Sequence, residues 1–118
     1  MIVDQLWTFD RNILISVKVG INWAFGHTKW SIPDDGKEGY VEEIQSNEVL
    51  GIVGEPMSGA EVTMQTNQSL GISNQKWIRK HYKNYTNWFT LTNSNTGLFL
   101  TCETKTLNGI TNPFLDGR

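Results

Sequence analysis

Short runs of β-branched and aromatic residues, separated by turn formers, limit the fold of this chain more than any other feature. Seven such runs span residues 13–19, 40–44, 48–53, 60–65, 75–82, 87–92 and 97–102. Glycine, proline, asparagine and aspartate fill the segments between them, as in "IPDDGKEG" and "GEPMSG". No window keeps apolar residues at the i, i+3, i+4, i+7 spacing of a helix for three turns. The sequence therefore predicts an all-β fold.

The 118 residues fit one domain, 1–118, which can bury a modest core without metal or disulfide. Cys102 is the single cysteine and follows Leu100 at the period of a strand, so it is interpreted as an inert buried thiol. A net charge of −2 provides no overall basic field, and neither nucleic acid nor an anionic membrane is an expected partner. Because no apolar run approaches about 18 residues, no membrane insertion is expected.

The first residues, "MIVDQLWTFDRN", lack the basic and then apolar layout of a signal peptide. Together with the single cysteine, this favours the cytoplasm slightly. A secreted chain that has lost its leader would look similar, so both compartments remain open.

Two Lys-Trp pairs, at 29–30 and 76–77, lie 47 residues apart and indicate an internal repeat. Shifting the chain by this interval places residues 13–30 over 60–77, with apolar positions on apolar positions and turns on turns. A further copy begins at 88–109, which is similar to 41–59. Three repeat units are therefore predicted, at approximately 1–30, 31–77 and 78–118.

The segment 50–77, which ends in "NQKW", resembles one repeat of a ricin-B-type β-trefoil domain, with Gln75 and Trp77 as its Gln-x-Trp signature. Residues 97–109 resemble the start of the next repeat, and residues 2–30 a degenerate preceding one. The resemblance implies a barrel of pseudo-threefold repeats with four strands each. It also implies that Trp77 and its counterpart Trp30 pack in the shared core and that Gln75 bonds to backbone at a repeat junction.

The ends depart from the family pattern. The first copy lacks its opening strand, and the last stops at "TNPFLDGR" without a closing Gln-x-Trp. In the family these two strands pair with each other. Three interpretations remain open: a shortened trefoil of about ten strands, a barrel completed by another copy of the chain in a homo-oligomer, and a fragment of a longer protein.

The resemblance also implies lectin activity, with shallow pockets in which a carboxylate holds sugar hydroxyls and an aromatic ring stacks on the sugar. In the first repeat Asp4 holds the carboxylate position, and Lys18 and His27 take the places of the ring and the amide. The ring would come from Trp23, or from Trp7. The alternative interpretation, with Asp4 solvated and Trp23 a packing residue, carries more weight because the stacking residue is displaced.

The other two repeats match the family pocket less well. In the second, Gln65 and Asn74 form a weaker pocket that lacks the carboxylate, since Gly51 holds that position. In the third, Thr101 holds the carboxylate position, with Asn112 and Phe114 downstream.

The sequence thus predicts a non-catalytic module that binds a glycan or glycoprotein. The alternative is a protease inhibitor or protein-interaction domain that presents the loops 31–39, 54–59 and 66–74. No nucleophile, acid–base pair or phosphate-binding loop points to an enzyme, and His27, His81 and Cys102 do not have metal-ligand spacing, so no cofactor is expected. The basic, alternating segment 77–83 is interpreted as a solvated strand face rather than a nucleic-acid patch.

Overall fold

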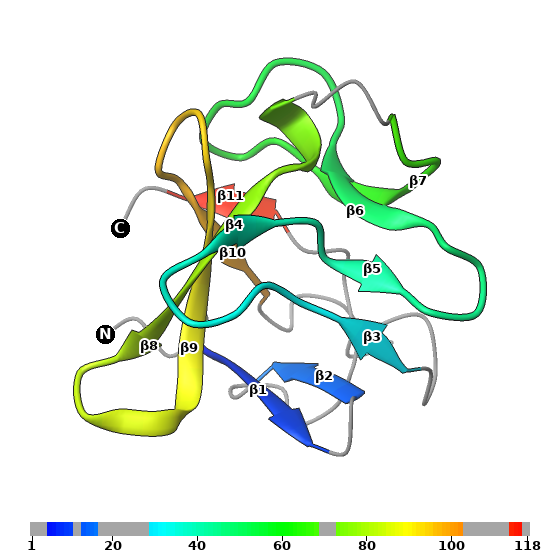
Figure 1. Cartoon of the computed structure of the whole chain (residues 1–118). Helices are drawn as coiled ribbons and strands as arrows, with labels where there is room; N and C mark the ends of the chain where they lie inside the picture. Colours follow the sequence, from blue (N-terminus) through cyan, green and yellow to red (C-terminus); the bar gives the residue numbers. More distant parts are fainter. Residues whose placement is uncertain (1–4, 11–12, 17–28, 69–72, 103–113, 117–118) are drawn as a thin grey trace, which may run out of the picture.

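The computed structural model describes residues 5–10, 13–16, 29–68, 73–102 and 114–116, and these form an all-β structure in two sheets (Figure 1). The larger sheet has the order β11-β10-β9-β1-β2, and β8 pairs with β9 and with β4. Its strands are β1 (Trp7–Asp10), β2 (Ile13–Ser16), β4 (Glu38–Gly39), β8 (Trp77–Tyr82), β9 (Tyr85–Asn93), β10 (Phe99–Thr101) and β11 (Phe114–Asp116).

The smaller sheet has the order β3-β5-β6-β7. Its strands are β3 (Trp30–Ser31), β5 (Glu42–Glu43), β6 (Val49–Ile52) and β7 (Val62–Gln65). A short 3-10 turn, η2 (Ser73–Gln75), precedes β8. The two sheets meet where Leu115 of β11 exchanges backbone hydrogen bonds with Gly59 and Ala60, which lie just before β7.

One hydrophobic core receives side chains from both sheets. Its buried members are Trp7, Leu14, Trp30, Val41, Leu50, Ile52, Val62, Trp77, Phe89, Leu91, Leu100, Cys102 and Leu115. All four residues of β6 are buried, as expected of a strand covered on both faces.

Three tryptophans occupy equivalent places in the strand pairing. Trp7, Trp30 and Trp77 are at most 2% exposed, and they begin β1, β3 and β8. Each of these strands pairs antiparallel with a later strand, so that the tryptophan stands opposite Ser16, Glu43 or Asn93, in that order. The indole nitrogens of Trp7 and Trp77 donate hydrogen bonds to the backbone oxygens of Leu100 (3.0 Å) and Leu50 (3.1 Å). These two carbonyls lie 50 residues apart.

The same interval of 50 residues relates two hairpin turns. The carboxylate of Glu43 accepts hydrogen bonds from the amides of residues 45 and 46, and the side-chain oxygen of Asn93 accepts them from residues 95 and 96. Asn47 and Gly97 then take left-handed conformations, with φ of 62° and 76°. The two turns thus have the same hydrogen-bonding pattern, although the acceptor is Glu43 in one and Asn93 in the other.

The structure confirms the all-β prediction. The eleven strands of the described residues form two sheets and no closed barrel, so the expected trefoil-like barrel of about ten strands is not confirmed. The pairing of β2 with β1 sets Ser16 opposite Trp7, and the pairing of β9 with β8 sets Asn93 opposite Trp77.

None of the described segments is a helix with the length and apolar character needed to cross a membrane.

Candidate functional site

The four residues of the first predicted pocket, Asp4, Lys18, Trp23 and His27, lie outside the described residues, as does Asn112. The alternative ring, Trp7, does not serve as a stacking surface, because it is fully buried and its indole nitrogen is bonded to Leu100. In the third repeat Thr101 is also fully buried, and its hydroxyl donates to the backbone oxygen of Phe99. A sugar therefore does not reach these two side chains.

The second predicted pocket is occupied by the protein itself. The side-chain oxygen of Gln65 accepts a hydrogen bond from Gln75 (3.0 Å), and Gln65 lies directly over Gly51, the position where the family has its carboxylate. The amide of Asn74 donates to the backbone oxygens of Ile52 (3.3 Å) and Gly54 (2.8 Å). Gln65 and Asn74 thus fasten chain segments together rather than line an open pocket.

The Gln-x-Trp segment holds backbone in the way that the resemblance implies. Gln75 is 1% exposed, its amide donates to the backbone oxygen of Thr66 (3.0 Å), and its oxygen accepts from the backbone amide of Gln68 (2.9 Å). These bonds fix the loop before η2, so that Trp77 enters the core at the start of β8.

The side chains of Tyr82, Tyr85 and Trp88 form a cluster, here called the aromatic patch, in which Tyr85 and Trp88 are exposed and Tyr82 is half-buried. The three residues belong to the end of the β8–β9 hairpin at which the two strands connect (Figure 1). The rings of Tyr82 and Tyr85 have centroids 6.1 Å apart and an interplanar angle of 8°. Those of Tyr85 and Trp88 are 5.3 Å apart at 30°. Tyr85 and Trp88 are 55% and 38% exposed, which is unusual for such large apolar surfaces.

An irregularity in the strand pairing creates this patch. His81 pairs with Phe89, but the next residue, Tyr82, pairs with Tyr85, so residues 86–88 have no partner opposite them. Side chains three residues apart point to opposite faces of a regular strand, and a bulge changes their direction. The extra residues of β9 thereby allow Tyr85 and Trp88 to stack on the same side.

A hollow of about 340 Å³ lies at the patch and is lined by Asn84, Tyr85, Asn87 and Trp88. The two asparagines offer amide donors and acceptors next to the rings. The ammonium group of Lys83 lies 5.1 Å from the centroid of the Tyr82 ring, a cation–π contact. The site therefore combines aromatic faces, amides and positive charge.

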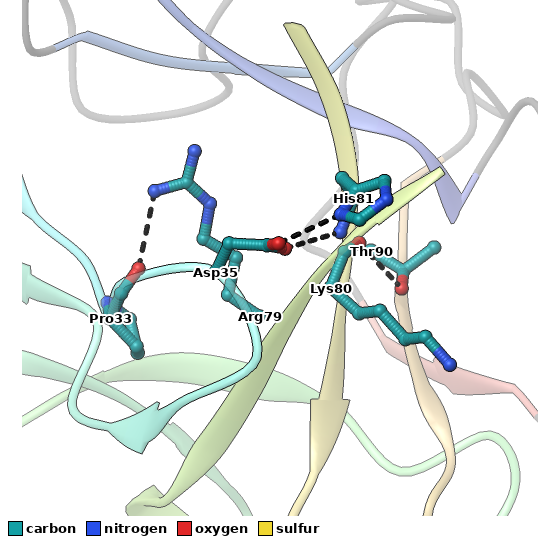
Figure 2. Close-up of polar contacts among 6 residues, drawn as sticks. All are labelled: Pro33, Asp35, Arg79, Lys80, His81 and Thr90. Atoms are coloured by element: carbon teal, nitrogen blue, oxygen red, sulfur yellow. Dashed lines mark hydrogen bonds and ion pairs between the residues drawn. The ribbon is translucent and has the colours of Figure 1, made fainter. Parts of the chain in front are cut away.

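A second feature fastens the loop before β4 to β8. Both side-chain oxygens of Asp35 bond to His81, one to its backbone amide and one to its imidazole Nδ1, each at 2.8 Å (Figure 2). Arg79 donates to the backbone oxygen of Pro33 (3.2 Å) and lies 4.5 Å from the centroid of the Phe89 ring. The hydrogen bond from the His81 side chain lowers the pKa of the Asp35 carboxyl. Sequence reasoning missed this pair because 46 residues separate its members.

A smaller, polar hollow of about 250 Å³ is lined by Glu38, Ser73, Lys76, Ser94 and Asn95. The ammonium group of Lys76 lies 4.7 Å from the centroid of the Tyr40 ring. The lining offers charged groups and hydroxyls, but no aromatic face on which a sugar could stack.

Within the described residues, no group of three or more His, Cys, Asp or Glu side chains is arranged to hold a metal ion. A comparison of this chain with known protein families, curated proteins and solved structures finds no match. Among the residues that the structure describes, the aromatic patch offers exposed ring faces beside a hollow with polar groups.

Proposed function

We propose that this protein is a non-catalytic binding module that recognises glycans through the aromatic patch on the β8–β9 hairpin. The observation that supports the proposal is the stack of Tyr82, Tyr85 and Trp88, of which the exposed Tyr85 and Trp88 line a hollow together with two asparagines. The apolar face of a pyranose packs on an aromatic ring, and its hydroxyls need hydrogen-bond partners of the kind that amides provide. This site replaces the family pockets, which in the second repeat are closed by Gln65.

The fold that accompanies this proposal is a β-trefoil with one short repeat. Trp30, Trp77 and Trp7 would close the three repeats, with the N-terminal strand β1 closing the one that begins at β8. Gln5 and Trp7 have the Gln-x-Trp spacing, and both are at most 1% exposed. The repeat from Trp7 to Trp30 then has 23 residues against 47 for the next. The equivalent turns at Glu43 and Asn93 support this arrangement.

Titration with oligosaccharides, followed by tryptophan fluorescence, tests the proposal, since Trp88 lies in the site. We expect a saturable change, and an affinity that Tyr85→Ala weakens by about tenfold, equivalent to the loss of roughly 1.4 kcal/mol of stacking and burial. Trp88→Ala, which lacks the reporting indole, should show a similar loss of affinity by isothermal titration. Met57→Ala is the matched control, because Met57 is exposed on another loop. Absence of binding across neutral and charged glycans would contradict the proposal.

The loop 54–59 supports a second candidate, a protease inhibitor or protein-interaction domain. Asn74 bonds the base of this loop, which presents Met57 at 60% exposure between two glycines with left-handed φ, Gly54 and Gly59. A rigid loop base with an exposed side chain suits binding in a protease cleft. Inhibition of one member of a protease panel, lost in Met57→Ala and kept in Tyr85→Ala, would favour this function over glycan binding.

A further inference from the structure

We infer that the aromatic patch selects an acidic oligosaccharide, one that carries sulfate or carboxylate groups, rather than a neutral one. This inference rests on the proposed function and adds the class of ligand. It is based on the charge around the patch, which the proposal of glycan binding does not use.

Charge is strongly segregated along the chain. Residues 62–102 contain no Asp or Glu, and their four basic residues, Lys76, Arg79, Lys80 and Lys83, fall within eight positions. The remainder of the chain has six Lys and Arg against twelve Asp and Glu, a charge of −6. The β8–β9 hairpin is thus the positive part of a protein whose net charge is −2.

The basic side chains of β8 point to different faces of the strand, because neighbouring residues alternate. Arg79 and His81 stand opposite the core residues Leu91 and Phe89 and are engaged with the loop that contains Asp35. Lys80 alternates with them and points away from Asp35 (Figure 2). It therefore lies on the face of β8 opposite to Arg79 and His81, two residues before Tyr82 in the chain.

Lys80 and Lys83 thus flank Tyr82 of the aromatic patch along the chain. Lys80 pairs with Thr90, which lies two residues after Trp88, and Lys83 contacts the Tyr82 ring. Both lysines are exposed, and in the described part of the chain neither forms an ion pair. Among the described strand partners of β8, the one carboxylate residue is Glu38, which is paired with Ile78 at the other end of the strand.

Two free cations beside aromatic rings and amides match a saccharide whose apolar face and anionic groups are close together. Single-stranded nucleic acid has the same two features, but its bases need open ring faces in succession. Here only Tyr85 and Trp88 of the three aromatic residues are exposed, and the rest of the chain is acidic, which disfavours a long polyphosphate. A short acidic oligosaccharide fits better.

The test uses isothermal titration of the full chain with a heparin-derived tetrasaccharide, the same tetrasaccharide after desulfation and N-acetylation, and chitotetraose. We expect the sulfated ligand to bind about tenfold more tightly than chitotetraose, with an affinity that falls as salt rises. The double variant Lys80→Ala/Lys83→Ala should lose most of this preference and keep its affinity for chitotetraose. Lys29→Ala, an exposed lysine elsewhere, is the control.

The outcomes separate the two proposals. Equal, salt-independent binding of sulfated and neutral ligands would overturn the inference and leave glycan binding standing. Failure of all three ligands to bind would overturn both. Tighter binding of a single-stranded oligonucleotide than of any saccharide, lost in Tyr85→Ala, would replace the acidic glycan with nucleic acid. A circular dichroism spectrum shared by all variants shows that each is folded.

Discussion

At the scale of single residues, Gln65 determines what the second repeat can do. Its side chain lies over Gly51 and accepts a hydrogen bond from Gln75. A Cβ atom at position 51 would meet the end of the Gln65 side chain, so a carboxylate at this position and the present Gln65 exclude each other. The sequence indicated that this pocket lacks its carboxylate, but not that a neighbouring side chain fills the space.

Gly51→Ala should therefore destabilise the protein by about 1–2 kcal/mol, as overpacking in a buried site does. Adding Gln65→Ala removes the obstructing side chain, so the double variant should lose less stability than the sum of the two single changes. Urea unfolding of the four proteins gives this coupling energy. Additive losses would mean that Gln65 moves aside without cost.

At the scale of elements, the sequence predicted seven of the strands that the structure describes and missed four. The strands β2, β5, β6, β7, β8, β9 and β10 lie at the predicted runs, whereas β1, β3, β4 and β11 do not. The strand β4 has only two residues, within a segment read as a turn, and β1 begins at the "WTFD" that precedes a turn. Such strands form because they pair with neighbouring strands, and not because their own residues strongly favour extended structure. The aromatic patch escaped prediction for a similar reason, since it depends on a bulge that only pairing reveals.

The two equivalent turns allow a prediction about pH at this scale. Burial alone would raise the pKa of Glu43, but the hydrogen bonds from residues 45 and 46 outweigh it and hold the pKa below its usual value of 4.5. Because the pKa of Glu43 is lower in the folded state than in the unfolded state, its ionised carboxylate stabilises the fold at pH values above the unfolded-state pKa. This contribution is lost as pH falls through the folded pKa.

Glu43→Asn places at this turn the residue that performs the same role at position 93. We expect stability within about 1 kcal/mol of the original at neutral pH, since the turn keeps a side-chain acceptor. Its loss of stability between about pH 5 and pH 3 should be smaller than that of the unaltered protein. Urea midpoints across this range, with Glu42→Gln as the matched control, measure both effects. If Glu43→Asn lost as much stability at low pH as the unaltered protein, the protonation of Glu43 would not be the cause of that loss.

At the scale of the whole molecule, the N-terminal strand β1 connects β2 to the rest of the larger sheet. The strand β1 lies between β2 and β9 in the larger sheet, and the indole of Trp7 bonds to Leu100, 93 residues away. The repeat pattern read from the sequence treated the N-terminal copy as degenerate and offered Trp7 as an alternative ring for a sugar pocket. Trp77 makes a bond of the same kind, to Leu50. The Gln-x-Trp spacing of Gln5 and Trp7 is a local signal that the prediction from the sequence did not use.

If Trp7 and Trp77 are equivalent anchors, their replacement by phenylalanine should have similar consequences. Each change removes a buried hydrogen bond and leaves a cavity, with an expected loss of about 2–3 kcal/mol in the free energy of unfolding. Trp88→Phe, at an exposed position, should change it by less than about 0.5 kcal/mol. Urea unfolding followed by circular dichroism compares the three variants. A large loss for Trp77→Phe together with none for Trp7→Phe would show that β1 is peripheral, and the N-terminal strand would then not close the fold.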